Sequence, residues 1–375
     1  MNLKTFSVLL AALTLLPMHS LSAGFKATLK SDIEIGNEWI GNIYKDYSAL
    51  PDRAGLLNIN FHSSLNYAPA VFSWWDYQLS MKKYSDYDFF DYNLHTITGK
   101  MLKNFGDWGS LEFKILYQSY QQDNYTPYNF NNLYAFPELK YYITDYTILK
   151  IGSPVSAVTY PNYILDFNSS GSSLKIIQEF NLFTTLELNA LSTVKTYPEW
   201  KIFTSTDGIL SSNQKSNEIE LGLTLAHVMQ KGQAGAYYIY NQLESNANFI
   251  DFGSDLTTGT GDESLINSYY DNYSQKAGLF FQYELFSKIN PVISAFIKET
   301  YYDSRLARNS SGNFLQDKRK DTNTSLTASL SFPVARIDTT TLDLKISCTS
   351  ETNVSNDYFY DYRNDTTALS VYCRF

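Results

Sequence analysis

Apolar and polar residues alternate one by one in many short segments of this chain of 375 residues. A clear example has Ile219, Leu221, Leu223 and Leu225 in alternation with Glu218, Glu220, Gly222 and Thr224. Successive side chains of a β-strand point to opposite faces, so a period of two predicts strands with one apolar and one polar face. The pattern recurs about every 20 residues along the chain and predicts sixteen strands.

The connections between the predicted strands alternate between short and long. Short turns are expected at Ala68-Pro69, at 106–109, at Thr144-Asp145 and at 230–232, and long connections at 120–134, 154–171, 197–215, 243–273 and 303–321. A soluble β-sandwich gives no reason for this alternation. A membrane barrel does, because its turns are short at one end and its loops long at the other. We therefore expect one all-β domain, a transmembrane antiparallel β-barrel of about sixteen strands (about 14 to 18), with short periplasmic turns and long outer loops.

The chain ends on a strand whose apolar positions are Leu369, Val371, Cys373 and Phe375. This ending resembles that of bacterial outer-membrane β-barrel proteins, and the resemblance implies that the final strand is the signal read by the barrel assembly machinery. Sixteen strands in about 350 residues also look like the general porins. The segment 322–375 is similar to the barrel portion of surface-lipoprotein assembly modifier proteins, which implies an alternative role with a protein partner.

The first 23 residues have the pattern of a cleaved secretory signal peptide. Lys4 precedes a nearly continuous apolar run from Phe6 to Leu16, and the small residue Ala23 supplies a cleavage position. No run of 18 apolar residues follows, so no membrane helix is expected. We expect removal of residues 1–23, a barrel domain over residues 24–375, and residence in the bacterial outer membrane.

Composition supports a barrel and excludes one class of partner. The 31 Tyr and 24 Phe suit strands and the aromatic girdles of membrane barrels. The formal net charge is −9, so binding to nucleic acid is not expected. Lipid and lipopolysaccharide are the expected surroundings. No cofactor is expected, and the oligomeric state stays open.

The polar strand faces predict what the interior does. Barrels of this size leave a water-filled lumen. We therefore expect an outer-membrane pore for passive diffusion of small hydrophilic solutes, with sugars as candidates and a weak preference for cations. The wall residues expected to set ion preference are Asp76, Lys82, Glu112, Lys114, Glu187, Glu218, Glu220, Asp343 and Lys345. The alternatives are a barrel component of an outer-membrane assembly or secretion system and, less favoured, an outer-membrane enzyme.

Few residues suggest catalysis or metal binding. His62 and Ser64 share one strand face and are similar to the His-x-Ser pair of outer-membrane phospholipases, but the residues after Ser64 depart from that pattern. The pair also lies on the polar face, whereas a lipase must meet lipid. We expect no catalytic residue, and no histidine has the spacing of a metal ligand set.

Three long connections have distinctive compositions. The segment 243–273 is acidic and could bind divalent cations loosely, although a solvated loop is favoured. The segment 303–321 is basic, and we expect its charges to be solvated, with lipopolysaccharide phosphates or the acidic loop as alternative partners. Tyrosines and amides in 120–134 suit sugars, although interfacial aromatics are favoured. The basic residues of the segment 303–321 are Arg305, Arg308, Lys318, Arg319 and Lys320.

The two cysteines, Cys348 and Cys373, fall on the last two predicted strands. An antiparallel pairing of these strands places Cys348 opposite about Thr366 and Cys373 opposite about Thr341. The sulfurs are then too far apart for a disulfide, which needs Cα atoms within about 7 Å. We expect two free thiols on the apolar face.

Overall fold

The computed structural model describes residues 26–375, with the exception of 69, 164, 182, 205–207, 247–270, 287–288 and 338–339. The predicted signal peptide, residues 1–23, lies outside the described residues. No helix of the described part is long and apolar enough to span a membrane. Its helical segments are single 3₁₀ turns: η2 (Asp88–Phe90), η3 (Thr126–Tyr128) and η6 (Tyr358–Tyr360).

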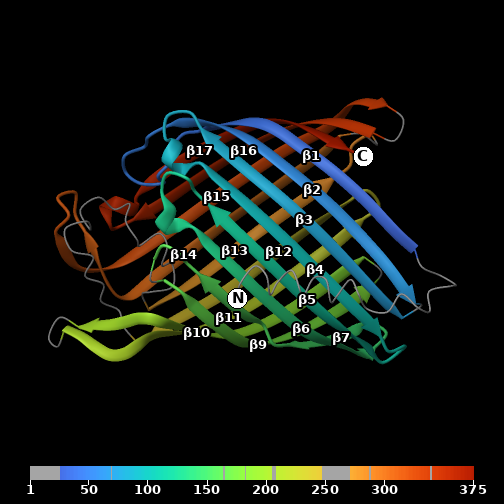
Figure 1. The fold of residues 1–375 in the computed structure, drawn as a ribbon, viewed down its shortest axis with the longest axis horizontal. Helices are drawn as coiled ribbons and strands as arrows, with labels where there is room; N and C mark the ends of the chain where they lie inside the picture. Colours follow the sequence, from blue (N-terminus) through green and yellow to red (C-terminus); the bar gives the residue numbers. More distant parts are fainter. Residues whose placement is uncertain are drawn as a thin grey trace.

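Antiparallel strands make up almost all of the described chain, and apart from β7 and β8 each pairs with its neighbours in sequence (Figure 1). The strands are β1 (Lys26–Ile40), β2 (Asp52–Ala68), β3 (Val71–Tyr84), β4 (Tyr92–Asn104), β5 (Gly109–Gln121), β6 (Phe130–Thr144), β7 (Thr147–Gly152), β8 (Val155–Thr159), β9 (Phe167–Asn181), β10 (Thr184–Thr204), β11 (Gly208–Met229), β12 (Gly232–Ser245), β13 (Asn272–Tyr283), β14 (Asn290–Arg308), β15 (Phe314–Ile337), β16 (Thr340–Ser355) and β17 (Tyr362–Arg374).

The sheet closes on itself because β17 pairs with β1. This ladder runs from Asp32↔Arg374 to Ile40↔Thr366, and β1 pairs with β2 on its other side. Strands β7 and β8 follow one another along the wall, since both lie between β6 and β9. Pro154 separates them and has no N–H to donate to the ladder. The described strands therefore form a closed wall of sixteen strands, as the sequence predicted.

The two ends of the barrel differ as expected. The short turns gather at one end, where the C-terminus also lies, on the right in Figure 1. The long connections lie at the opposite end, where the β10–β11 hairpin (yellow-green) and the β14–β15 hairpin (orange) project beyond the wall. We call these the turn end and the loop end.

Three predicted long loops are wrong in extent because strands continue into them. Strand β8 lies within the predicted loop 154–171, strands β10 and β11 extend through most of 197–215, and β14 and β15 extend through most of 303–321. The ladders of the two hairpins contain register shifts beyond Thr196 and Tyr301. Polar hairpins beyond the wall keep backbone pairing but have no apolar face, so alternation gives no signal there.

The strand faces follow one rule around the whole wall. A cavity inside the barrel is lined by Glu218 and Glu220 of β11, whereas the intervening Ile219 and Leu221 are 47% and 48% exposed on the opposite face. Cross-strand register carries this assignment to every neighbour, because directly paired residues share a face. The charged wall positions therefore face the lumen, together with some apolar residues such as Ile239 and Leu243, and the large exposed apolar side chains face outward.

The last two strands differ by one residue from the predicted register. Cys348 pairs with Thr367 rather than Thr366, and Cys373 pairs with Leu342 rather than Thr341. Both cysteines are free and lie on the outward face. Cys373 is paired six residues along β16 from Cys348, a separation of about 20 Å at the rise of a strand.

This register predicts which cysteine pairs can crosslink. A Thr367→Cys variant places a new thiol directly opposite Cys348, so mild oxidation should join these two residues in most folded molecules. The parent protein, with Cys348 and Cys373 alone, should keep two free thiols under the same conditions. Non-reducing peptide mapping by mass spectrometry measures both. An intramolecular Cys348–Cys373 disulfide in folded parent protein would contradict the β16–β17 register.

Candidate functional site: the barrel lumen

The inward face holds all nine residues that the sequence placed on the wall. Each lies on the lumen side of its strand, as the cross-strand registers require: Asp76, Lys82, Glu112, Lys114, Glu187, Glu218, Glu220, Asp343 and Lys345. The structure thus assigns them a face, and their effect on ion preference stays a prediction.

Most of these wall charges lie in cross-strand ion pairs. Lys195 Nζ is 3.1 Å from Glu218, Lys175 Nζ is 2.6 Å from Glu187, and Lys100 Nζ is 3.3 Å from Glu112. Further pairs join Lys82 to Glu38, Lys345 to Glu34, Arg374 to Asp343, Lys150 to Glu138 and His62 to Asp76. Most of these ion-pair partners were not predicted from the sequence, although each lies at a polar position of its own strand.

A few lumen charges have no ion pair within the part of the chain that the structure describes. Among them are Lys114 on β5, Glu220 on β11, Lys276 on β13 and Lys298 on β14. Lys276 and Lys298 are opposed directly in the β13–β14 ladder, so two lysine side chains enter the lumen from adjacent positions of one wall. Neither lysine was predicted as a wall residue, because the alternation of these two segments is marked mainly by their apolar positions.

A cavity of about 560 Å³ lies in the lumen against β10 to β14. Its lining residues are Tyr160, Leu165, Phe167, Lys195, Tyr197, Glu218, Glu220, Ile239, Asn241, Leu243, Asn272, Ser274, Lys276 and Lys298. Tyr160 and Leu165 come from the short β8–β9 connection, which folds against the wall at the loop end. Burial raises the pKa of Tyr160, so its phenol stays neutral and able to donate a hydrogen bond.

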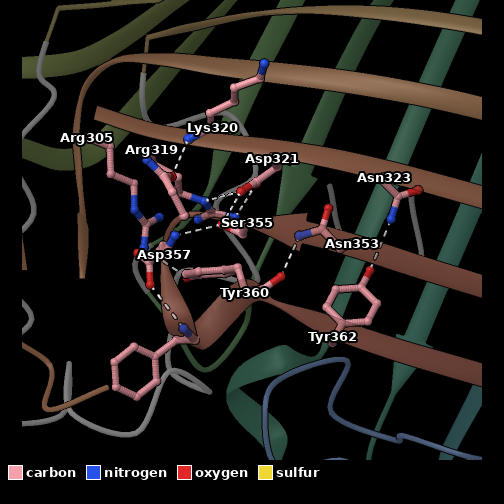
Figure 2. Close-up of polar contacts among 12 residues, drawn as sticks. Arg305, Arg319, Lys320, Asp321, Asn323, Asn353, Ser355, Asp357, Tyr360 and Tyr362 are labelled. Atoms are coloured by element: carbon pink, nitrogen blue, oxygen red, sulfur yellow. Dashed lines mark hydrogen bonds and ion pairs between the residues drawn. The ribbon is translucent and has the colours of Figure 1, made fainter. Parts of the chain in front are cut away.

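The loop end contains a second cluster, in which the β14–β15 hairpin meets the β16–β17 loop (Figure 2). Asp357 has no exposed surface and accepts a hydrogen bond from Arg308 Nε at 3.2 Å. Arg319 donates to both carboxylate oxygens of Asp321, at 2.9 and 2.5 Å, and its guanidinium lies 3.3 Å from the centre of the Tyr360 ring. Arg305 donates to the Tyr360 hydroxyl at 3.0 Å. We call this set the arginine cluster.

The arginine cluster fixes the β16–β17 loop in place. Asp357 caps the η6 turn by accepting from Phe359 N at 3.2 Å, and Asn353 Nδ2 donates to the Tyr360 carbonyl at 2.5 Å. Ser355 Oγ donates to Asp321 at 2.7 Å, which ties β16 to β15 (Figure 2). Buried charges are stable only when paired and hydrogen-bonded. The loop is therefore held by a network that loses stability if one member is removed.

The expectation of solvated charge in 303–321 is wrong for its three arginines. Arg305, Arg308 and Arg319 are 7%, 3% and 5% exposed, and each contacts an aspartate or a tyrosine of this chain. They therefore do not present free guanidinium groups to lipopolysaccharide. Lys318 and Lys320 are exposed, as expected.

The other candidates from the sequence gain little from the structure. His62 contacts Asp76, while Ser64 Oγ lies 2.5 Å from Thr28 Oγ1, so the described contacts do not join His62 to Ser64 as a nucleophile and base. Most of the acidic segment 243–273 lies outside the described residues. Within the described ranges no group of three or more potential metal ligands is found. Rings in 120–134 pack on one another, as in Tyr125 with Tyr128 at 4.5 Å.

Comparisons with known proteins agree in fold only. No family model matches the chain, and no curated protein matches its sequence. Solved structures do: a bacterial polysaccharide outer membrane secretin has 9% identity and a TM-score of 0.46 over 92% of this chain and 98% of its own. A loop L8 deletion mutant of OmpT, an outer membrane protein of Vibrio cholerae, has 7% identity and a TM-score of 0.48 over 94% and 99%. OccK7 (OpdD) of Pseudomonas aeruginosa has 10% identity and a TM-score of 0.48 over the same shares. At such low values, functional conclusions must come from this chain's own geometry.

The arginine cluster leads to a stability prediction. An Asp357→Asn substitution keeps the shape of the side chain but leaves the Arg308 guanidinium buried without its carboxylate, which should lower the free energy of unfolding by about 3 to 5 kcal/mol. The matched control is Asp365→Asn, which breaks the exposed Arg363–Asp365 pair and should cost about 0 to 1 kcal/mol. Urea unfolding in detergent measures both. Equal stability of the two variants would show that the cluster does not hold the loop.

Proposed function

We propose that this protein is an outer-membrane pore through which small hydrophilic solutes diffuse passively. The observation that carries the proposal is the closed wall of sixteen strands, whose inward face holds many charged and polar side chains and encloses a cavity. A wall of that size leaves room for water and solutes, whereas an eight-stranded barrel is filled by its own side chains. Lumen ion pairs between neighbouring strands support a hydrated interior, since charged side chains seldom line a dry core.

The outward face supports the membrane location. Large apolar side chains are exposed along the strands, for example Ile35 at 61%, Leu279 at 63% and Leu326 at 53%. Soluble proteins rarely expose contiguous apolar surface of that extent, because water contact costs about 25 cal/mol per Å². Lipid removes this cost, and a closed wall leaves no strand edge without backbone partners. The proposed surroundings are therefore outer-membrane lipid and lipopolysaccharide.

The end of the chain fits the proposed route to the membrane. Leu369, Val371 and Cys373 lie on the outward face of β17 opposite Asn37, Ile35 and Ile33 of β1, and Phe375 N donates to Ser31 O at 2.9 Å. A terminal strand that closes the ring is a sensible element for the barrel assembly machinery to read. Cleavage of residues 1–23 during export belongs to the same proposal.

We further propose that ion preference is weak and favours cations. The net charge of −9 favours cations, whereas the lysines beside most wall carboxylates and the lumen lysines without an ion pair oppose that preference and keep it weak. Sugars remain candidate solutes, because they are neutral and small enough for such a lumen.

Planar bilayer recording tests the pore and its ion preference together. Purified protein should give stepwise conductance in potassium chloride. At 0.1 M salt the reversal potential should indicate a modest preference for potassium that fades at 1 M, as the screening length falls from about 10 to about 3 Å. Heat-inactivated protein is the control. The pore proposal fails if folded protein inserts without conductance, and a chloride preference at 0.1 M would contradict the selectivity alone.

A further inference from the structure

Two ammonium groups in the lumen cavity have no carboxylate partner in the described chain. Lys276 of β13 and Lys298 of β14 are directly opposed, and like charges in that arrangement destabilise a sheet. Lys276 Nζ lies 4.0 Å from the centre of the Phe296 ring, and this aromatic contact is its nearest compensation. A fold that keeps such a pair retains a site that an anion can neutralise.

Nearby carboxylates offset this positive charge only in part: Glu218 and Asp321 act electrostatically on Lys298, but neither forms an ion pair with it. Glu218 is already engaged, with Lys195 Nζ at 3.1 Å and Asn241 Nδ2 at 2.8 Å. Glu220 lies on β11, so strand β12 separates it from β13 and from both free lysines. The lining has three lysines against two glutamates, and the excess is concentrated on β13 and β14.

The remainder of the lining suits a polyhydroxylated ring. Phe167 is half-buried and offers an aromatic face, and the ring of Tyr197, which is only 4% exposed, packs against it at 5.5 Å between ring centres. Asn241 and Asn272 line the same cavity with amides. The cavity of about 560 Å³ falls within the usual size of small-ligand sites. An aromatic face, amides and a local excess of positive charge together match a sugar that carries an anionic group.

We propose that this cavity is a binding subsite for acidic sugars, whose carboxylate or phosphate lies between Lys276 and Lys298 while the ring lies against Phe167. The subsite adds to the proposed pore function, because it names a class of solute that the lumen retains. It rests on that function only in requiring a lumen that is open to solutes. It differs from selectivity for simple ions, because both the charge and the sugar ring contribute to binding.

Isothermal titration of the folded full-length protein in detergent tests the subsite without any conductance measurement. The probes are glucuronate, glucose 6-phosphate, glucose and acetate. At least one acidic sugar should bind about tenfold more tightly than glucose and than acetate, and the tighter of the two identifies carboxylate or phosphate as the preferred group. Acidic sugars that bind no better than glucose or than acetate would overturn the proposal.

Lysine variants locate the site. The double variant Lys276→Gln, Lys298→Gln should reduce binding of the acidic sugar to the level of glucose, and it should fold, because it removes a repulsion. Lys114→Gln is the matched control: it removes one lumen lysine that also has no ion pair, on β5 and outside the cavity, and should change affinity less than about twofold. Heat-modifiable gel mobility confirms folding. Unchanged affinity in the double variant overturns the subsite, whereas loss of conductance with intact binding overturns only the pore.

Discussion

The whole structure depends on the pairing of the last strand with the first. Without the β1–β17 ladder, two strand edges with unpaired N–H and C=O groups would be exposed, which is costly in a membrane and invites aggregation in water. Once the ring closes, each register is tied to its neighbours, because a one-residue slip anywhere would turn a strand's apolar face inward. The assignment of one strand therefore fixes all the others, and the charged lumen and apolar exterior follow from a single ring of backbone hydrogen bonds.

Sequence alternation predicted the strands well where one face of a strand is apolar and outward and the other is polar and faces the lumen. The side chains of Ile219, Leu221, Leu223 and Leu225 face outward. Glu218 and Glu220 face the lumen, so the alternation there is strict. It fails beyond the wall, where the β14–β15 hairpin has water on the outside and a polar cluster within. Arg319 and Asp321 are two residues apart in that hairpin and pair with each other. In the sequence alone, such closely spaced opposite charges look the same as charges exposed to solvent. Only three-dimensional proximity to Asp357 and Tyr360 shows that these groups are buried.

The one-residue error in the last hairpin has a simple physical reason. The predicted register aligns the ends of the two strands at one edge of the barrel, whereas the observed one matches apolar residues: Ile346 pairs with Leu369 and Leu344 with Val371. Placing these four side chains on one face excludes the predicted register, because a slip of one residue would put the two pairs on opposite faces. The identity of the wall residues was accessible in the same way, but their partners were not, because which lysine reaches which carboxylate depends on the registers of two ladders at once.

The distribution of charge along the lumen separates two structural roles. At the loop end, charges are buried and saturated with hydrogen bonds, as in Arg319 with Asp321, and they hold segments together. Along the wall, pairs such as Lys195–Glu218 are half-exposed and contribute little to stability, so they are retained for what they do to the interior. Pairing keeps the lumen hydrated without a strong field of either sign. Against that balanced background, Lys276 and Lys298 on β13 and β14 are opposed without an ion pair, and Glu218 and Asp321 offset their charge only in part. Lys100 is likewise opposed to Lys114, but it has Glu112 at 3.3 Å, so the pair on β13 and β14 differs in having no carboxylate at ion-pair distance from either lysine within the described chain.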